Sequence, residues 1–244
     1  RNPVWFPESE TNNNLSYGMN RARLAWYVID PLFFEETSAA TPSYIKNNPD
    51  VRSNFFVYDF KEKSLFPERE NPYGIDPRLQ TLNVAFYPSE RGPYNYDTTN
   101  ITETGQLANP EERWGGMMRS IRTNDFESAN IEFIEFWMMD PFVYDTNGVR
   151  EGGYLYFNLG NVSEDILKDS RKAFENGLPT SDEVQLVDST VWGRVPIVQS
   201  LVNAFNNDPG TRAYQDVGLD GLPDEDEELF FQEYLDALLH NGVN

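Results

Sequence analysis

The sequence of 244 residues contains no cysteine and only one histidine, His240. Without cysteine there are no disulfides, no thiolate zinc sites and no cysteine nucleophiles. A single histidine excludes any site in this chain that needs two imidazoles, and the absence of cysteine and of a central histidine argues against a catalytic triad. Nothing in the sequence marks a reactive centre, and we predict that the protein is not an enzyme.

Basic residues are also scarce. The chain has 19 Lys and Arg against 40 Asp and Glu, which gives a formal net charge of −21. Such a surface repels the phosphates of nucleic acids and anionic lipids, so we expect no nucleic-acid partner. Long apolar runs are missing too, since none reaches the ~20 residues that a spanning helix needs. The acidic balance fits divalent cations or a well-solvated exterior.

Aromatic residues are abundant, at 14% of the chain, together with 16 Gly and 16 Pro, a composition typical of short strands joined by turns. The strongest strand pattern is Ile131–Met139, which is apolar on both faces and interrupted only by Glu132 and Glu135. A strand that is apolar on both faces must be covered on both, so it is expected in the middle of a packed sheet. Tyr154–Leu159 is predicted as a second aromatic strand.

Other segments complete a mainly β prediction. Strand patterns are found at Arg23–Ile29, Phe55–Phe60, Thr81–Tyr87, Trp114–Ile121 and Val184–Val187. After Gly160 the period becomes helical, with helices expected from Ser163, from Pro196 and over Glu225–His240. We therefore predict a jelly-roll, galactose-binding-like β-sandwich with two or three helices in the C-terminal third. The expected division is a flexible segment over 1–20, the sandwich over 21–190 and a helical extension over 191–244.

The clearest chemical motif is an acidic loop at residues 216–227. Calcium loops of twelve residues supply oxygens from positions one, three, five, seven, nine and twelve, with glycine at position six for a sharp turn. Gly221 occupies position six, and the predicted Ca²⁺ ligands are Asp216, Asp220, Leu222 through its carbonyl, Asp224 and Glu227. Position three is Gly218, which has no side-chain ligand, and no convincing helix precedes the loop. The motif predicts a structural calcium site that is not a complete EF-hand.

The same acids allow a simpler interpretation. Asp224 could be the N-cap of the last helix, with Glu227 completing a capping box. That interpretation explains Asp224–Glu228 but leaves Asp216, Asp220 and Gly221 without a role. The calcium site and the capping box are therefore both possible interpretations of the sequence.

Two other site types are weaker. Paired carboxylates could hydrolyse glycosides, but with 40 acids some pair arises by chance. Exposed Trp5, Tyr94 and Trp114 could stack on sugars, which makes a cell-surface carbohydrate-binding module with a jelly-roll fold the alternative function.

Several phrases of the sequence, taken in order, resemble the SprA/Sov family. These phrases are Gly92–Asn95, Arg113–Arg119, Asn130–Phe142, Gly153–Asn161, Phe174–Pro179 and Gln215–Gly221. The family comprises very large outer-membrane β-barrel proteins of Bacteroidetes that form the translocon of type IX secretion and support gliding motility in some members. The chain is too short for such a barrel, so the resemblance implies a soluble domain inserted in, or excised from, a protein of this kind.

The resemblance also sets expectations for location and partners. It implies a non-catalytic structural or interaction domain whose parent protein lies in the outer membrane, with this chain at the cell surface or the periplasmic face. The expected partners are other type IX secretion components or exported cargo proteins.

Overall fold

The structure is a computed structural model of the chain. It describes residues 14–30, 37–58, 60–71, 73–121, 123, 125–145, 148, 152–160, 165–171, 186–198 and 205–243. The chain divides into two compact units, of which one comprises Arg1–Ala22 with Pro88–Asn244 and the other comprises Arg23–Tyr87.

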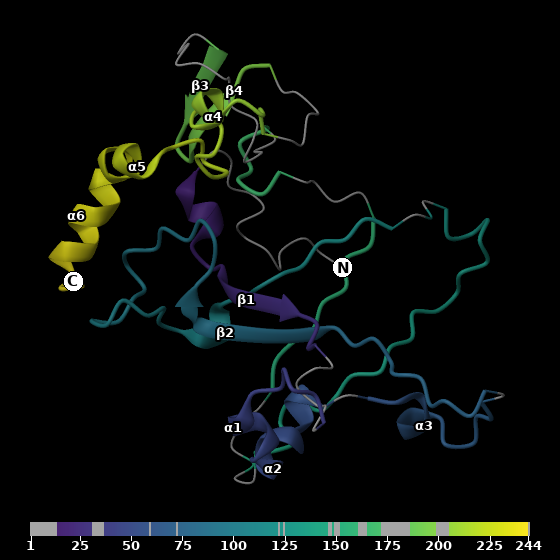
Figure 1. Ribbon diagram of the computed structural model, residues 1–244. Coiled ribbons are helices and arrows are strands. Elements are labelled where there is room, and N and C mark those ends of the chain that lie inside the picture. Colours follow the sequence, from purple (N-terminus) through teal and green to yellow (C-terminus); the bar gives the residue numbers. More distant parts are fainter. Residues whose placement is uncertain are drawn as a thin grey trace. The chain divides into compact units, whose positions relative to one another are not determined.

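The described strands form two small sheets (Figure 1). β1 (Ala22–Tyr27) pairs with β2 (Asn83–Arg91). β3 (Val187–Thr190) and β4 (Gly193–Pro196) form an antiparallel hairpin in which Val187 pairs with Pro196 and Thr190 with Gly193. The hairpin turns at Val191 and Trp192.

Helices are short, apart from those at the C-terminal end. The unit Arg23–Tyr87 contains α1 (Ser43–Lys46), α2 (Pro49–Arg52), the 3₁₀ helix η5 (Phe55–Val57) and α3 (Glu62–Leu65). The other unit contains η3 (Leu15–Gly18), η6 (Pro110–Glu112), α4 (Pro209–Arg212), α5 (Asp224–Phe230) and α6 (Gln232–His240). None of the helices in the described ranges is long and apolar enough to cross a membrane.

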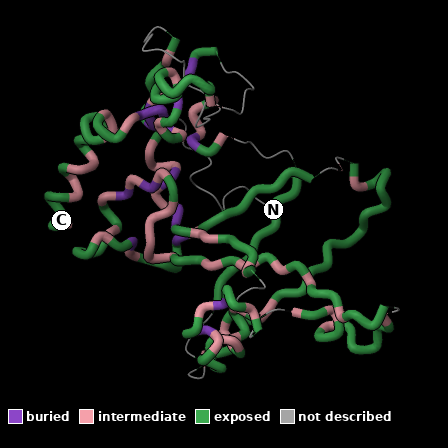
Figure 2. The backbone as a smooth tube through the Cα atoms, in the orientation of Figure 1, coloured by how far each residue is buried: buried purple, intermediate pink, exposed green. Residues whose placement is uncertain are grey.

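The prediction of a mainly β jelly-roll sandwich is wrong. The part of the chain that the structure describes has only the two two-stranded sheets. Ile131–Met139 and Tyr154–Leu159, predicted as central strands, belong to no sheet, and their side chains are almost all exposed (Figure 2). An alternating apolar pattern needs neighbouring strands to bury it. These segments have none among the described residues, so both of their faces remain open.

Elsewhere the strand predictions succeeded where the alternation was regular. The predictions at Arg23–Ile29 and Thr81–Tyr87 are confirmed by β1 and β2. Phe55–Phe60 instead begins with η5, because the Asn54 side chain accepts the Phe56 N–H at 2.9 Å and caps a helical turn. Of Trp114–Ile121, only Trp114 takes part in a β-bridge, with Arg21.

The last helix is confirmed as α5 and α6, which are interrupted at Phe231. The helix expected from Ser163 is not formed over residues 165–171, where Lys168 and Ser170 have φ values of 51° and 67°. Pro196 ends β4 and starts no helix. The rest of both predicted helices lies mostly outside the described residues. Half of Val184–Val187 does so too, and its last residue begins β3.

The core of the larger unit gathers around the β3–β4 turn. Trp192 is fully buried, and Leu107, Val195 and Leu222 are nearly so. The Tyr96 ring lies 6.1 Å from Trp192 and stacks on Phe231 at 4.6 Å between ring centroids. This aromatic packing holds the C-terminal helices against the hairpin, and the acidic loop precedes them directly in sequence.

Candidate functional site

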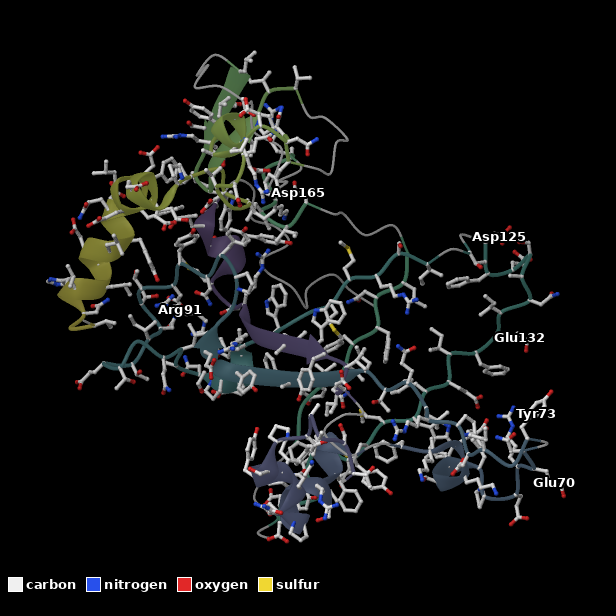
Figure 3. All side chains as sticks on the ribbon, in the orientation of Figure 1. Glu70, Tyr73, Arg91, Asp125, Glu132 and Asp165 are labelled. Carbon is white, nitrogen blue, oxygen red and sulfur yellow. The ribbon has the colours of Figure 1, made fainter. Side chains whose placement is uncertain are left out.

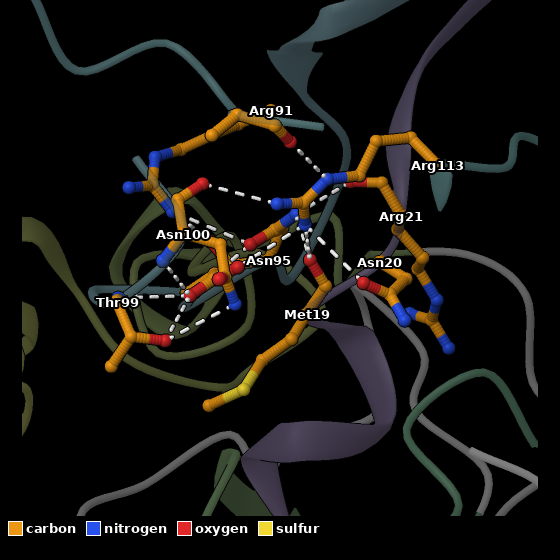
Figure 4. A network of polar contacts seen from close by, with 10 residues as sticks. Met19, Asn20, Arg21, Arg91, Asn95, Thr99, Asn100 and Arg113 are labelled. Carbon is orange, nitrogen blue, oxygen red and sulfur yellow. Dashed lines mark hydrogen bonds and ion pairs between the residues drawn. The ribbon is translucent and has the colours of Figure 1, made fainter. Parts of the chain in front are cut away.

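The most deeply buried polar group is an ion pair between Asp97 and Arg113. Figure 4 shows the polar network around Arg113, which includes Met19, Asn20 and Asn100. Arg113 Nη1 lies 3.1 Å from Asp97 Oδ2, and neither side chain is more than 1% exposed. The guanidinium also donates to the carbonyl oxygens of Met19 at 2.6 Å, Ala108 at 2.9 Å and Asn100 at 3.0 Å. Arg113 therefore ties together three separate stretches of backbone.

The second carboxylate oxygen of Asp97 is hydrogen-bonded by residues of its own loop. Its Oδ1 accepts the backbone N–H groups of Thr99 at 2.9 Å and Asn100 at 3.1 Å. Burial alone would raise the pKa of Asp97, but these hydrogen bonds and the one from Arg113 outweigh burial and hold the pKa below its ordinary value. Asp97 is thus a buried, fully bonded carboxylate, which suits a structural role.

Asn95 completes this network. Its amide nitrogen donates to the carbonyl oxygens of Met19 at 2.8 Å and Arg21 at 2.6 Å, and its Oδ1 accepts the Asp97 N–H at 2.9 Å. Gly92 lies against the same segment, since a Cβ at this position would be 2.6 Å from the Ala22 carbonyl oxygen. The region before β1 is therefore fixed by polar contacts from residues 92–113.

The predicted calcium loop lies against the β3–β4 hairpin. The Arg194 N–H donates to the Asp220 carbonyl at 2.6 Å. Gly193 approaches so closely that a Cβ would lie 2.1 Å from that carbonyl oxygen, and its φ of 136° also favours glycine. Within the loop, Gly221 has a φ of 68°, so the sharp turn expected at position six is present.

Positions five and twelve of the loop are brought together. The carboxyl groups of Asp220 and Glu227 share a hydrogen bond, and Asp220 Oδ1 also accepts the Leu222 N–H at 3.3 Å. Asp220 is only 8% exposed. Burial raises the pKa of Asp220. Burial, followed by the charge of Asp220 and then that of Asp224, raises the pKa of Glu227.

The nearby phenol of Tyr96 responds to the same charges. Its pKa is raised, first by burial and then by the negative charge of Asp220, with smaller effects that include Glu227. A cation beside the two carboxylates would lower all three pKa values, because it stabilises the charged forms. The donor chemistry at this point thus suits a hard cation.

The other predicted ligands are placed elsewhere. Asp216 is half-exposed, and its Oδ2 lies 3.6 Å from Arg212 Nε. Asp224 is exposed in the first turn of α5, and the Leu222 side chain is buried in the core. Throughout the described ranges, which include the whole loop, no three acidic or histidine side chains converge as a metal site. Two of the five predicted ligands are therefore assembled, and calcium stays a prediction.

The capping-box interpretation of the same acids is wrong. The N-cap of α5 is Pro223, with no side-chain cap, and Asp224 is already inside the helix. Glu227 uses its carboxyl group on Asp220 instead. The acids at this helix start are thus not explained by capping, although their charges still favour the N-terminal end of the helix dipole.

The alternative sites find little support in the structure. The Trp114 ring packs over the Arg21 guanidinium at 5.8 Å, and Trp5 lies outside the described residues. The hydrogen-bonded pair of Asp220 and Glu227 is closer than the separation of about 5 Å that retaining glycosidases use. In the smaller unit, a mainly apolar cavity of about 360 Å³ is lined by residues including Val28, Ile29 and Ile45.

Sequence reasoning missed the network of Asp97, Arg113 and Asn95. Sixteen residues separate the two charges, so neither looks different from a surface residue. The only local signal was the run Asn95–Asn100, in which short polar side chains are able to bond the backbone two residues on.

A scan against models of known protein families finds no match, and a search of curated proteins finds none with significant similarity. A function for this chain must therefore be argued from its own residues.

Proposed function

We propose that this chain is a non-catalytic structural and interaction domain of a SprA/Sov-like outer-membrane translocon, acting in type IX protein secretion and gliding motility. One observation carries the proposal. Three of the six phrases that resemble the family, Gly92–Asn95, Arg113–Arg119 and Gln215–Gly221, contain residues whose contacts hold the larger unit together. Gly92, Asn95 and Arg113 fix the segment before β1, and Asp220 anchors the hairpin.

The character of these contacts supports a role without chemistry. Asp97 and Arg113 are closed off from solvent and saturated with hydrogen bonds, so they are unable to transfer a proton to a substrate. Tyr94 has a φ of 58°, which is the left-handed backbone conformation that its turn requires. The resemblance therefore includes residues that fix the backbone of the larger unit. Such residues suit a domain that holds or contacts other proteins.

The proposed setting follows the family. The chain acts in an outer-membrane-associated assembly, at the cell surface or the periplasmic face, and contacts other secretion components or exported cargo. Co-purification tests this with the intact parent protein, using an exported cargo domain as bait and an unrelated protein of similar charge as control. Retention on the cargo alone supports the proposal, and repeated failure with both cargo and translocon components refutes it.

We further propose that the loop 216–227 is a calcium clasp that fastens α5 to the β3–β4 hairpin. Asp220 and Glu227 would hold the ion with the Leu222 carbonyl, and Asp216 and Asp224 would complete the shell after Asp216 leaves Arg212. Calcium would supply charge neutralisation and no reactive chemistry. Because the described residues form two small sheets and not the predicted sandwich, the carbohydrate-binding alternative has no scaffold there and is not proposed.

Calorimetry of calcium into chelator-treated protein tests the clasp. At a concentration one hundred times its Kd, a ligand of the native state stabilises it by about 2.7 kcal/mol, so the melting temperature should rise. Glu227→Gln should abolish both the heat and the rise. Glu228→Gln, which changes an exposed neighbour that is not a predicted ligand, should retain them. No heat at millimolar calcium in the unaltered chain would refute the clasp.

A further inference from the structure

The smaller unit, Arg23–Tyr87, carries a loop after α3 whose tip holds two apolar side chains in solvent. At this tip Tyr73 is 85% exposed and Ile75 is 71% exposed, and Gly74 between them has a φ of 66°. Figure 3 shows the Tyr73 side chain at the outer end of the loop, directed away from α3. The exposed tyrosine therefore belongs to a projection and not to a flat surface.

The loop is held in shape by its own hydrogen bonds. A β-bridge between Lys61 and Arg78 closes its base. Nearer the tip, the Gly74 N–H donates to the Asn71 carbonyl at 3.1 Å, and the Asn71 side-chain amide donates to the Ile75 carbonyl. A loop that is already ordered loses little conformational entropy when it binds. Exposed tyrosine on such a loop is the arrangement that binding loops use as an anchor.

The same unit contains a cavity that matches this tip. Its volume is about 360 Å³, and its wall is mainly apolar, with Val28, Ile29 and Ile45 among the lining residues. Asp30 and Arg52 are the charged residues on its described lining. The size is at the lower end of the about 300–1,000 Å³ of small-ligand pockets, so the cavity is large enough for one or two side chains.

Tyrosine suits both parts of this lining. Its ring packs on the apolar wall, and its hydroxyl can donate to the Asp30 carboxylate, since a buried phenol needs a polar partner. Because Tyr73 is 85% exposed, it does not occupy the cavity of its own chain. Each copy of the chain therefore presents a free tip together with a cavity of the chemistry that the tip requires.

The distribution of charge allows two copies to meet at this unit. Residues 23–87 contain seven Lys and Arg against nine Asp and Glu, so they carry only −2 of the formal net charge of −21. The other unit carries the remaining −19, and its self-repulsion opposes association there. The three tip residues are uncharged, so their insertion beside Asp30 and Arg52 brings no like charges together.

We propose that the chain associates with a second copy of itself by inserting Tyr73 and Ile75 of one copy into the cavity of the next. The tip and the cavity are different surfaces, so the contact is heterologous, and it builds open chains or closed rings. Repulsion between the acidic units weakens the association at low salt, and added salt strengthens it. This inference goes beyond the proposed translocon role and does not depend on it.

Analytical ultracentrifugation of the full chain tests the contact, at protein concentrations up to millimolar and in about 0.15 M and about 1 M salt. Tyr73→Ser removes the anchor, and Val28→Asp places a charge in the apolar wall. Both residues are more than half exposed, so folding is retained. The matched controls are Tyr154→Ser and Val198→Asp, which change residues that are 90% and 77% exposed in the other unit.

The unaltered chain and both controls should sediment faster as protein and salt concentrations rise. Tyr73→Ser and Val28→Asp should each lower the association constant about tenfold or more. Mixing these two variants should restore one contact, because Tyr73→Ser keeps an intact cavity and Val28→Asp keeps an intact tip. The mixture should form a one-to-one heterodimer that grows no further, since its remaining tip and cavity are both altered.

A chain that stays monomeric at millimolar concentration in about 1 M salt would overturn the proposal. Association that neither Tyr73→Ser nor Val28→Asp weakens would also overturn it. Loss in both variants without recovery on mixing would indicate a symmetric contact and would contradict the heterologous one. A monomeric chain whose Tyr73→Ser variant no longer retains exported cargo in the co-purification above would assign the tip to another protein, and would overturn the proposal as well.

Discussion

Replacing Arg113 by methionine should unfold much of the larger unit. The substitution keeps most of the apolar stem but removes the charge that compensates Asp97, which has no exposed surface. It also leaves the carbonyl oxygens of Met19, Ala108 and Asn100 without the guanidinium N–H groups that they accept. Breaking a buried ion pair from one side typically costs about 3–5 kcal/mol. Since domains are stable by only about 5–15 kcal/mol, the loss is severe.

Urea denaturation of the unaltered chain and four variants measures the effect. We expect Arg113→Met to lose about 3–5 kcal/mol and Asp97→Asn to lose less, because its amide oxygen still accepts the loop N–H groups. The double variant should be less destabilised than the sum of the two, since the second change removes a charge that is already unpaired. As a control, Arg171→Met breaks the exposed pair with Asp188, at 3.2 Å, and should cost less than about 1 kcal/mol. An Arg113→Met protein within about 1 kcal/mol of the unaltered chain would refute the reasoning.

Three further predictions concern the same unit. The pKa of Asp97 is lowered in the folded state. Its contribution to stability is therefore present above its unfolded pKa of about 3.9 and is lost as pH falls through the folded pKa. In Asp97→Asn, the free energy of unfolding should decline less steeply over this acid range than in the unaltered chain. The pKa of Glu227 is raised in the folded state, so the folded state favours the protonated carboxyl group. The contribution of Glu227 to the free energy of unfolding is therefore present at acid pH and is lost as pH rises. Without calcium, Glu227→Gln should therefore melt above the unaltered chain at neutral pH, with the gap closing on acidification; a lower melting temperature would contradict this. Gly193→Ala should destabilise by about 1–3 kcal/mol or more, through strain and the clash with the Asp220 carbonyl, whereas Gly153→Ala, with open space around it, should be close to neutral in thermal melts.

Local signals in the sequence predicted the elements that local contacts suffice to form. The alternation at Arg23–Ile29 and Thr81–Tyr87 gave two strands that pair with each other. The helical period over Glu225–His240 gave α5 and α6. Gly221 formed the turn that its place in the acidic loop predicted.

The failures have a common cause in the lack of a partner. Ile131–Met139 has the strongest strand pattern in the chain, yet a strand exists only beside a paired strand, and neither of the two described sheets includes this segment. The pattern therefore indicates that the segment needs a neighbouring strand, which the part of the chain described by the structure does not supply. The helix expected from Ser163 is also not formed over residues 165–171, where Leu167 is buried in an irregular turn while Ile166 stays exposed.

The site was only partly predictable. Of the five ligands predicted in the acidic loop, Asp220 and Glu227 lie together in the structure, and the calcium site stays a prediction. No spacing rule links Asp97 to Arg113, since each is a lone charge and their contact depends on the fold of the segments between them. The dominant buried polar contact thus became visible only in three dimensions.

The central proposal is that the chain is a non-catalytic interaction domain of a SprA/Sov-like translocon. Hydrogen–deuterium exchange of the Ile131–Met139 amides tests it, measured in the chain alone and in the assembled SprA/Sov-like translocon. The proposal predicts slower exchange of these amides in the assembly than in the chain alone. Equal exchange in both states, or protection that is already complete in the isolated chain, would contradict it.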